Sequence, residues 1–192
     1  WEEKVNTDRG ERIRVYGRLY DADLGALRGT FQISEGVEVE IAPRADGAGD
    51  RFAVAYRTDR RPEIGEDFST VVTLRRDGSV LRRKIVSDTI RYPDVAVLDD
   101  GSVFFAYQRD AGAAGWDNFL TLYDPDGAAI GGEYNVSLPR GGRQFGGSIA
   151  AHQGNLAAAT WGSGAWEGML DFLKVNARAE PIDVDPPLLN NR

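Results

Sequence analysis

The chain has 192 residues, no cysteine, a single histidine and a formal net charge of −7. The lack of cysteine excludes disulfides, thiolate nucleophiles and cysteine-based zinc sites, and one histidine excludes a site built on two histidines of this chain. The acidic balance argues against nucleic acid as a partner, and no apolar run approaches the length of a membrane span.

Residues 1–36 predict two strands joined by a turn. The turn spans residues 19–25 and is rich in Asp and Gly, and the alternating segment 30–34 follows it. Trp1 falls where the last residue of a second strand stands in later units. We therefore expect these residues to carry only the third and fourth strands of a unit that upstream sequence or another chain completes.

The same landmarks recur about every fifty residues along the chain. Residues 54–59 match residues 105–110, and Trp161 takes the corresponding place in the next unit. Asp-Gly turns and short alternating segments recur at similar spacing. The repeats predict a half unit at 1–36 and full units at 37–89, 90–139 and 140–187.

The unit at 90–139 shows the expected internal order of strands. Apolar or alternating segments lie at residues 94–98, 103–107, 119–123 and 133–136, and Asp-Gly turns separate the first pair and the last pair. No amphipathic helix interrupts them. The pattern predicts an all-β fold, a β-propeller of four-stranded antiparallel blades with about three and a half blades present; a β-sandwich is the alternative.

Residues 92–107 carry a resemblance to a known group of repeats. The order Pro-x-Val-Ala-x-Leu, then Asp-Gly and an apolar strand, resembles tandem repeats of large secreted or surface bacterial proteins of the haemolysin-like kind. The resemblance implies a non-catalytic binding or scaffolding module in a periplasmic, cell-surface or secreted setting. Its partners would be a glycan, a protein, or chain segments and subunits that complete the propeller.

The tripeptide Arg91-Tyr92-Pro93 looks like the Arg-Ile-Pro motif of sialidases, in which the arginine binds the substrate carboxylate. That resemblance implies the alternative function, a portion of a sialidase-like propeller glycoside hydrolase. The chain has no second Arg-x-Pro and no Asp-box, so no catalytic residue is assigned. The structural interpretation is that Pro93 stiffens the entry to a strand.

Two tryptophans are candidates for contact with a ligand. Trp116, followed by Asp117, and Trp166 fall in predicted loops between second and third strands, on the face where first strands begin. An exposed Trp beside a carboxylate suits sugar stacking, although packing over the blade explains it equally well. Strand order places Arg91 and Arg143 at the same rim.

Other recurrent residues have structural interpretations. One aromatic position recurs at a strand end and is expected to pack between units; its members are Trp1, Tyr56, Tyr107 and Trp161. The aspartate-rich turns at 21–23, 99–100 and 124–126 could supply oxygen ligands to calcium, but none has EF-hand spacing, so no metal or cofactor is assigned. The basic run 82–84 indicates a solvated outer strand or a positive edge.

Overall fold

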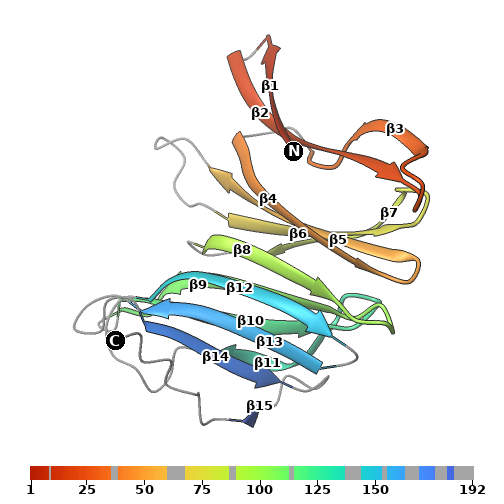
Figure 1. Cartoon of the computed structure of the whole chain (residues 1–192). Coiled ribbons are helices and arrows are strands. Elements are labelled where there is room, and N and C mark those ends of the chain that lie inside the picture. The colour runs from red at the N-terminus through yellow and green to blue at the C-terminus, as the bar shows by residue number, and fades with distance from the viewer. Residues whose placement is uncertain are drawn as a thin grey trace.

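The chain folds into antiparallel sheets. The computed structural model describes residues 1–8, 10–35, 39–59, 68–86, 90–112, 115–136, 144–152, 155–162, 169–175 and 181–183. Of these, residues 85, 144–146 and all those after 151 are described by their backbone alone. These residues form four sheets, each a meander in which consecutive strands pair (Figure 1). The predicted all-β, antiparallel class is confirmed, while no sheet closes on itself.

The strands are numbered in chain order. The first sheet consists of β1 (Glu2–Thr7), β2 (Gly10–Tyr20) and β3 (Ala26–Gln32). The second consists of β4 (Val39–Ala48), β5 (Arg51–Asp59), β6 (Phe68–Arg75) and β7 (Val80–Val86). The third consists of β8 (Ile90–Val97), β9 (Val103–Asp110), β10 (Trp116–Tyr123) and β11 (Ala129–Asn135). The fourth consists of β12 (Gln144–His152), β13 (Asn155–Gly162), β14 (Met169–Val175) and β15 (Pro181–Asp183).

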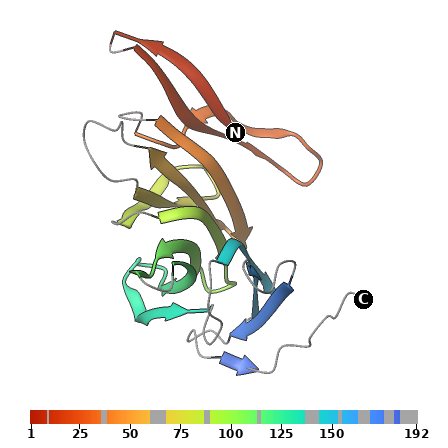
Figure 2. The same cartoon turned by 90° about the vertical axis from the view of Figure 1, so that its left-hand side faces the viewer.

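Residues 1–36 hold three strands, one more than the sequence predicts. β1 pairs with β2 from Glu2–Val15 to Thr7–Gly10. The prediction missed β1 because the strand is mostly polar and exposed, without the apolar alternation that marks a half-buried strand. Its hairpin with β2 extends away from the other sheets (Figure 2).

The tight turns follow their predicted chemistry. The glycines that close three hairpins have positive φ, 76° at Gly78, 87° at Gly101 and 76° at Gly127. The carboxylate of Asp100 accepts a hydrogen bond from the Ser102 amide at 2.8 Å. Such turns require the left-handed region, which glycine enters without a steric penalty.

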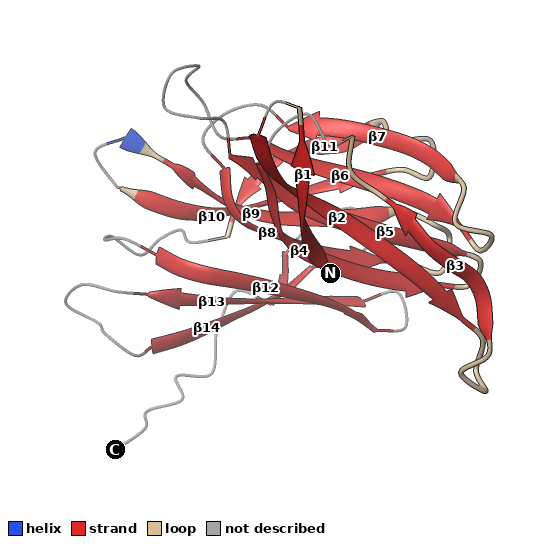
Figure 3. Cartoon of the chain, turned by 90° about the horizontal axis from the view of Figure 1, so that it is seen from above, coloured by secondary structure: helices blue, strands red, loops and turns tan. Residues whose placement is uncertain are grey.

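Successive sheets pack face to face and bury one apolar cluster in each gap. Between the first and second sheets lie Val15, Ile33, Val54, Tyr56, Val72 and Leu74. Between the second and third lie, among others, Ala53, Ala55, Val71, Val95, Phe105 and Tyr107. Between the third and fourth, Ile149 packs on Ala96, Phe104, Ala106, Leu120 and Leu122. The sheets therefore form a stack with its core between the layers (Figure 1). Viewed from above, strands of the first two sheets overlap, with β1 and β2 over β4 and β5 (Figure 3).

The first strands of the sheets approach one another closely. β8 contacts β4 and β5 of the second sheet, and β12 contacts β8 and β9 of the third. A carboxylate of the preceding sheet accepts a hydrogen bond from an edge amide of each first strand. The pairs are Glu2 with Ala42 N at 3.2 Å, Asp46 with Val97 N at 2.8 Å and Asp94 with Ile149 N at 3.0 Å. The described residues contain no helix of the length and apolar character that a membrane crossing needs.

Candidate functional site

Arg91 and Trp116 form the centre of the candidate site. Arg91 lies near the start of β8, and its guanidinium carbon sits 4.2 Å from the centroid of the Trp116 ring. Both side chains are only partly buried. The prediction placed Trp116 in a loop, but it opens β10 and pairs with Asp110. Strand pairing therefore holds the indole in place, and the arginine stacks on it as a cation–π pair.

Arg91 belongs to a row of polar side chains that crosses the third sheet. Arg91 pairs with Gln108, and Gln108 pairs with Asn118. Gln108 and Asn118 are 1% and 2% exposed. Cross-strand neighbours share a face of the sheet, and so do residues two apart on one strand. Trp116 therefore lies on the same face as this row.

Asp117 is not part of the same surface. Alternate residues of a strand point to opposite faces, so Asp117 points away from Trp116. It is 3% exposed, and its Oδ2 accepts a hydrogen bond from Asn135 Nδ2 at 2.9 Å. The structure thus brings Arg91 and Trp116 together and separates Asp117 from them. The other two candidates, Trp166 and Arg143, lie outside the described residues.

The Arg-x-Pro tripeptide coincides with a bulge that the second sheet repeats. The ladder of β8 shifts register between Arg91 and Asp94, and that of β4 shifts between Ile41 and Arg44. The residue before each proline has positive φ, 49° at Tyr92 and 53° at Ala42. Because β4 carries the same bulge without an arginine, the proline's role here is structural.

These bulges line a small cavity along the first strands. It has a volume of about 250 Å³ and is bounded by Ala42, Arg44, Tyr92, Pro93, Asp94, Gly147 and Ser148. Asp94 Oδ2 accepts hydrogen bonds from Ser148 Oγ at 2.9 Å and from the Ile149 amide. The carboxylate is therefore engaged in joining two sheets.

The sequence analysis missed a polar cluster around the buried Tyr107, on the opposite face of the third sheet. Tyr107 donates a hydrogen bond to Glu133, which also forms an ion pair with Arg109. Tyr107 is 4% exposed, and burial, followed by the bond to Glu133, raises the pKa of its phenol. The phenol therefore stays protonated at neutral pH and acts as a hydrogen-bond donor.

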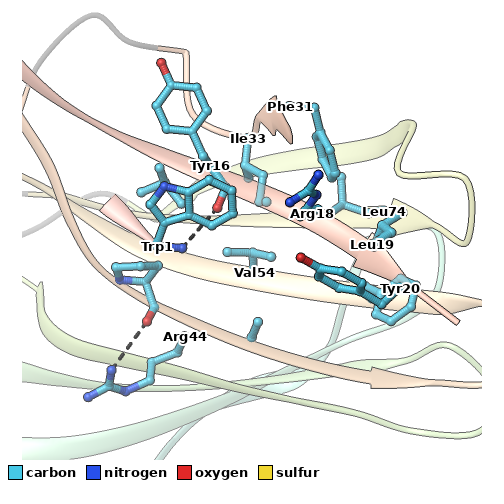
Figure 4. Close-up of a pocket in the computed structure, with 15 residues that line it drawn as sticks. Trp1, Tyr16, Arg18, Leu19, Tyr20, Phe31, Ile33, Arg44, Val54 and Leu74 are labelled. Carbon is cyan, nitrogen blue, oxygen red and sulfur yellow. Dashed lines mark hydrogen bonds between the residues drawn. The ribbon is translucent and has the colours of Figure 1, made fainter. Parts of the chain in front are cut away.

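A larger cavity lies between the first two sheets. Its volume is about 520 Å³, and apolar side chains dominate its lining, including Phe31, Ile33, Val54 and Leu74 (Figure 4). Trp1 stands at this cavity, with its ring stacked on Tyr16 at 6.1 Å between centroids. Trp1 is 50% exposed, so it is only half covered between the first two sheets, whereas Tyr56 and Tyr107 are buried between sheets. The side chain of Trp161 lies outside the described residues.

The aspartate-rich turns use their carboxylates on the chain itself. Asp21 Oδ1 accepts from the amides of Asp23 and Gly25, and Asp124 Oδ1 accepts from the Ala128 amide at 2.7 Å. In the described part of the chain, no three His, Cys, Asp or Glu side chains come close enough together to hold a metal ion. These contacts favour the structural interpretation of the turns over calcium.

Comparison with known proteins shows a short similarity. No protein-family model matches the chain. The protein named "Putative NAD(P)H nitroreductase acg" of Mycobacterium tuberculosis, in two strains, is 39% identical over 69 residues, which cover 33% of this chain and 21% of that protein. The similarity thus spans about a fifth of the length of the curated relatives, and it does not place the chain in a family.

Proposed function

We propose that this chain is a non-catalytic binding module built of β-propeller-type blades, with Arg91 and Trp116 contacting the ligand. The ligand is a glycan or a protein partner, and the module belongs to a bacterial extracytoplasmic protein. The observation that carries the proposal is the cation–π pair at one end of the third sheet, where a partly exposed indole and a partly exposed guanidinium lie against each other.

The arrangement of the sheets supports the propeller assignment. Three sheets are four-stranded meanders in chain order, as in a propeller blade. The first strands β4, β8 and β12 approach one another, while the fourth strands β7, β11 and β15 lie at the opposite edges of their sheets. A β-sandwich would pair two sheets over one core, whereas here each of three gaps holds its own cluster.

The chemistry of the pair favours a ligand with a flat apolar face and an anionic group. An indole stacks on the apolar face of a sugar ring or on an aromatic side chain. The guanidinium offers several N–H donors in a plane that matches a carboxylate. Gln108 and Asn118 lie buried in the adjoining row, on the same face of the sheet as Trp116.

The sialidase-like alternative has less support. It requires an arginine free to bind a carboxylate and an activated tyrosine beside an acidic group. Tyr107 does pair with Glu133, but it is buried and the pKa of its phenol is raised, which opposes nucleophilic attack. Nitroreductase activity is not assigned, since the similarity covers only 21% of that protein.

The binding role can be tested with variants at the rim. The ligand is first identified on a glycan array or in a pull-down. We expect Trp116→Ala to weaken its binding by about 1–3 kcal/mol, and Arg91→Met to weaken the binding of an anionic ligand by a similar amount. Adding Trp166→Ala tests the second tryptophan. Arg76→Met, which removes an exposed arginine in a turn of the second sheet, is the charge-matched control and should leave affinity unchanged.

Thermal melts of the same variants separate binding from packing. If Trp116→Ala lowers the melting temperature but leaves the affinity of the folded protein unchanged, the indole serves packing and the assignment fails. Hydrolysis of a glycoside by the isolated chain would contradict the non-catalytic role.

A further inference from the structure

The small cavity along the first strands is lined by an irregularity that three sheets repeat. The ladder shifts register between Ile41 and Arg44 in β4, between Arg91 and Asp94 in β8, and between Phe145 and Ser148 in β12. All the residues that line the cavity of about 250 Å³ lie within these three bulges. A bulge changes the direction of the groups that it carries. The three bulges therefore present side chains and backbone from three sheets to one space.

Arg44 provides this cavity with hydrogen-bond donors. Its side chain is exposed, and its Nη1 donates to the Pro43 carbonyl at 3.3 Å. None of the ion pairs among the described residues includes Arg44. A guanidinium has several N–H donors in one plane, which match the two oxygens of a carboxylate. Most of these donors are available to an anionic group in the cavity.

Asp94 lines the same cavity, and donors of the protein already hold its carboxylate. Oδ1 accepts from the Val95 amide at 3.0 Å, and Oδ2 accepts from the Ser148 hydroxyl and the Ile149 amide. A carboxylate accepts about four hydrogen bonds, so one further donor can bind to Asp94. Since the present donors are neutral, a hydroxyl group suits this place. The cavity thus combines a cation with an acceptor for a hydroxyl.

The bulge also offers a backbone amide. In the second sheet, the Ala42 amide donates to the Glu2 carboxylate at 3.2 Å. Tyr92 takes the equivalent place in the third sheet, because each residue precedes the proline of its bulge and has positive φ. No side chain of the described residues accepts from the Tyr92 amide. This amide is therefore a second donor, at a place where the fold already binds a carboxylate.

The side chain of Tyr92 is held in an unfavourable backbone conformation beside the cavity. Its φ is 49°, and its side chain is 52% exposed. Positive φ is disfavoured for an aromatic residue, and such strain is concentrated at sites that bind ligands. A half-exposed phenol ring offers a flat face to a sugar ring.

We propose that the cavity at the three bulges binds a polyhydroxylated carboxylate of the size of one sugar acid. The carboxylate binds to the Arg44 guanidinium and the Tyr92 amide, a hydroxyl donates to Asp94, and the sugar ring lies against the Tyr92 ring. A volume of about 250 Å³ is near the lower end of ligand sites and suits a single ring. The site does not depend on the function of Arg91 and Trp116.

Titration with D-glucuronate, followed by NMR and calorimetry, tests the proposal. We expect saturable binding that shifts the amide signals of Ala42 and Ser148. D-glucose lacks the carboxylate and acetate lacks the ring, so each should bind about tenfold more weakly or less. If D-glucose binds as tightly as D-glucuronate, the carboxylate is not recognised and the proposal fails. Equal affinity for acetate would exclude the sugar ring from recognition and would also overturn it.

Variants at the bulges assign the binding to this cavity. Arg44→Gln should weaken D-glucuronate binding about tenfold, while Arg76→Gln, at an exposed turn arginine, should leave it unchanged. Tyr92→Gly should raise the melting temperature, because glycine suits positive φ, and yet weaken binding several-fold.

Two results would contradict the assignment. Unchanged affinity in Arg44→Gln, with the fold verified by its melt, would show that the guanidinium does not bind the carboxylate. Loss of the Ser148 shift in Arg91→Met but not in Arg44→Gln would place the anion beside Trp116 instead. The second result would overturn the proposal for this cavity while supporting the function proposed for Arg91 and Trp116.

Discussion

Leu24 occupies a backbone position that suits glycine. Its φ is 62° and its side chain is 80% exposed. Its amide donates to the Asp21 carbonyl, as the Gly127 amide donates to the Asp124 carbonyl. The two residues are therefore equivalent in their turns, and Leu24 bears the strain that a Cβ experiences at positive φ.

We expect Leu24→Gly to stabilise the fold by about 0.5–1 kcal/mol, because it relieves this strain and removes an exposed side chain. Gly127→Ala is the reciprocal test. A Cβ there would lie 2.4 Å from Arg82 Cδ at a φ of 76°, so we expect a loss of about 1–2 kcal/mol. Gly132→Ala, in open space, is the control. Urea denaturation measures all three, and a destabilised Leu24→Gly variant would show that the turn tolerates leucine without strain.

At the scale of elements, the outer strand β7 joins the first sheet to the second. Arg83 donates to the Tyr56 hydroxyl at 2.6 Å and to the Ile33 carbonyl at 2.7 Å, and its Nε lies 3.2 Å from Glu35. Its side chain is 19% exposed. The arginine thus satisfies acceptors on two sheets at once, and its loss would leave them without a charged donor.

Replacing Arg83 with Met keeps much of the apolar stem but removes these bonds. We expect a loss of about 1–3 kcal/mol in stability and faster hydrogen exchange in β2 and β3 than in β9 and β10. Arg76→Met is the matched control because Arg76 is exposed. A uniform rise in exchange across all sheets would show that Arg83 supports the whole fold rather than one junction.

The repeats and Asp-Gly turns allowed the antiparallel class to be predicted, because turn glycines and apolar alternation are local signals. The contacts of Arg83 with two sheets and the stacking of Arg91 on Trp116 could not be predicted in the same way. The sequence of a basic run on an outer strand indicates solvent exposure, because it does not show where the neighbouring sheet lies. In the structure, Arg83 donates a hydrogen bond from the second sheet to the Ile33 carbonyl next to β3. The contact between Arg91 and Trp116 likewise depends on how β8, β9 and β10 align.

At the scale of the whole molecule, buried phenols stabilise two of the junctions between sheets. Tyr56 lies between the first and second sheets, and Tyr107 and Tyr123 lie between the second and third. Burial is the largest cause that raises the pKa of each, to about 12 for Tyr56. The folded state therefore holds these protons more tightly than the unfolded chain.

Below about pH 10, where the tyrosines of the unfolded chain begin to ionise, the buried phenols contribute their full share to the free energy of unfolding. This contribution is lost as the pH rises through the pKa of the folded state. We expect the free energy of unfolding to fall between about pH 10 and 12. Tyr56→Phe should reduce this slope, with an effect on the order of 1–3 kcal/mol across the window. Urea denaturation from neutral to alkaline pH measures the slope. An unchanged slope in Tyr56→Phe would show that the phenol ionises alike in both states.

The carboxylates that accept hydrogen bonds from the edge amides of β4, β8 and β12 affect whether other chains can pair with these edges. An open sheet ordinarily offers its first strand as a template for aggregation. Here Glu2, Asp46 and Asp94 each occupy an amide that an incoming chain would need, and each is supplied by the sheet before. Each layer thus blocks the growth point of the next. The protection of these edges therefore depends on the order of the layers as much as on their cores.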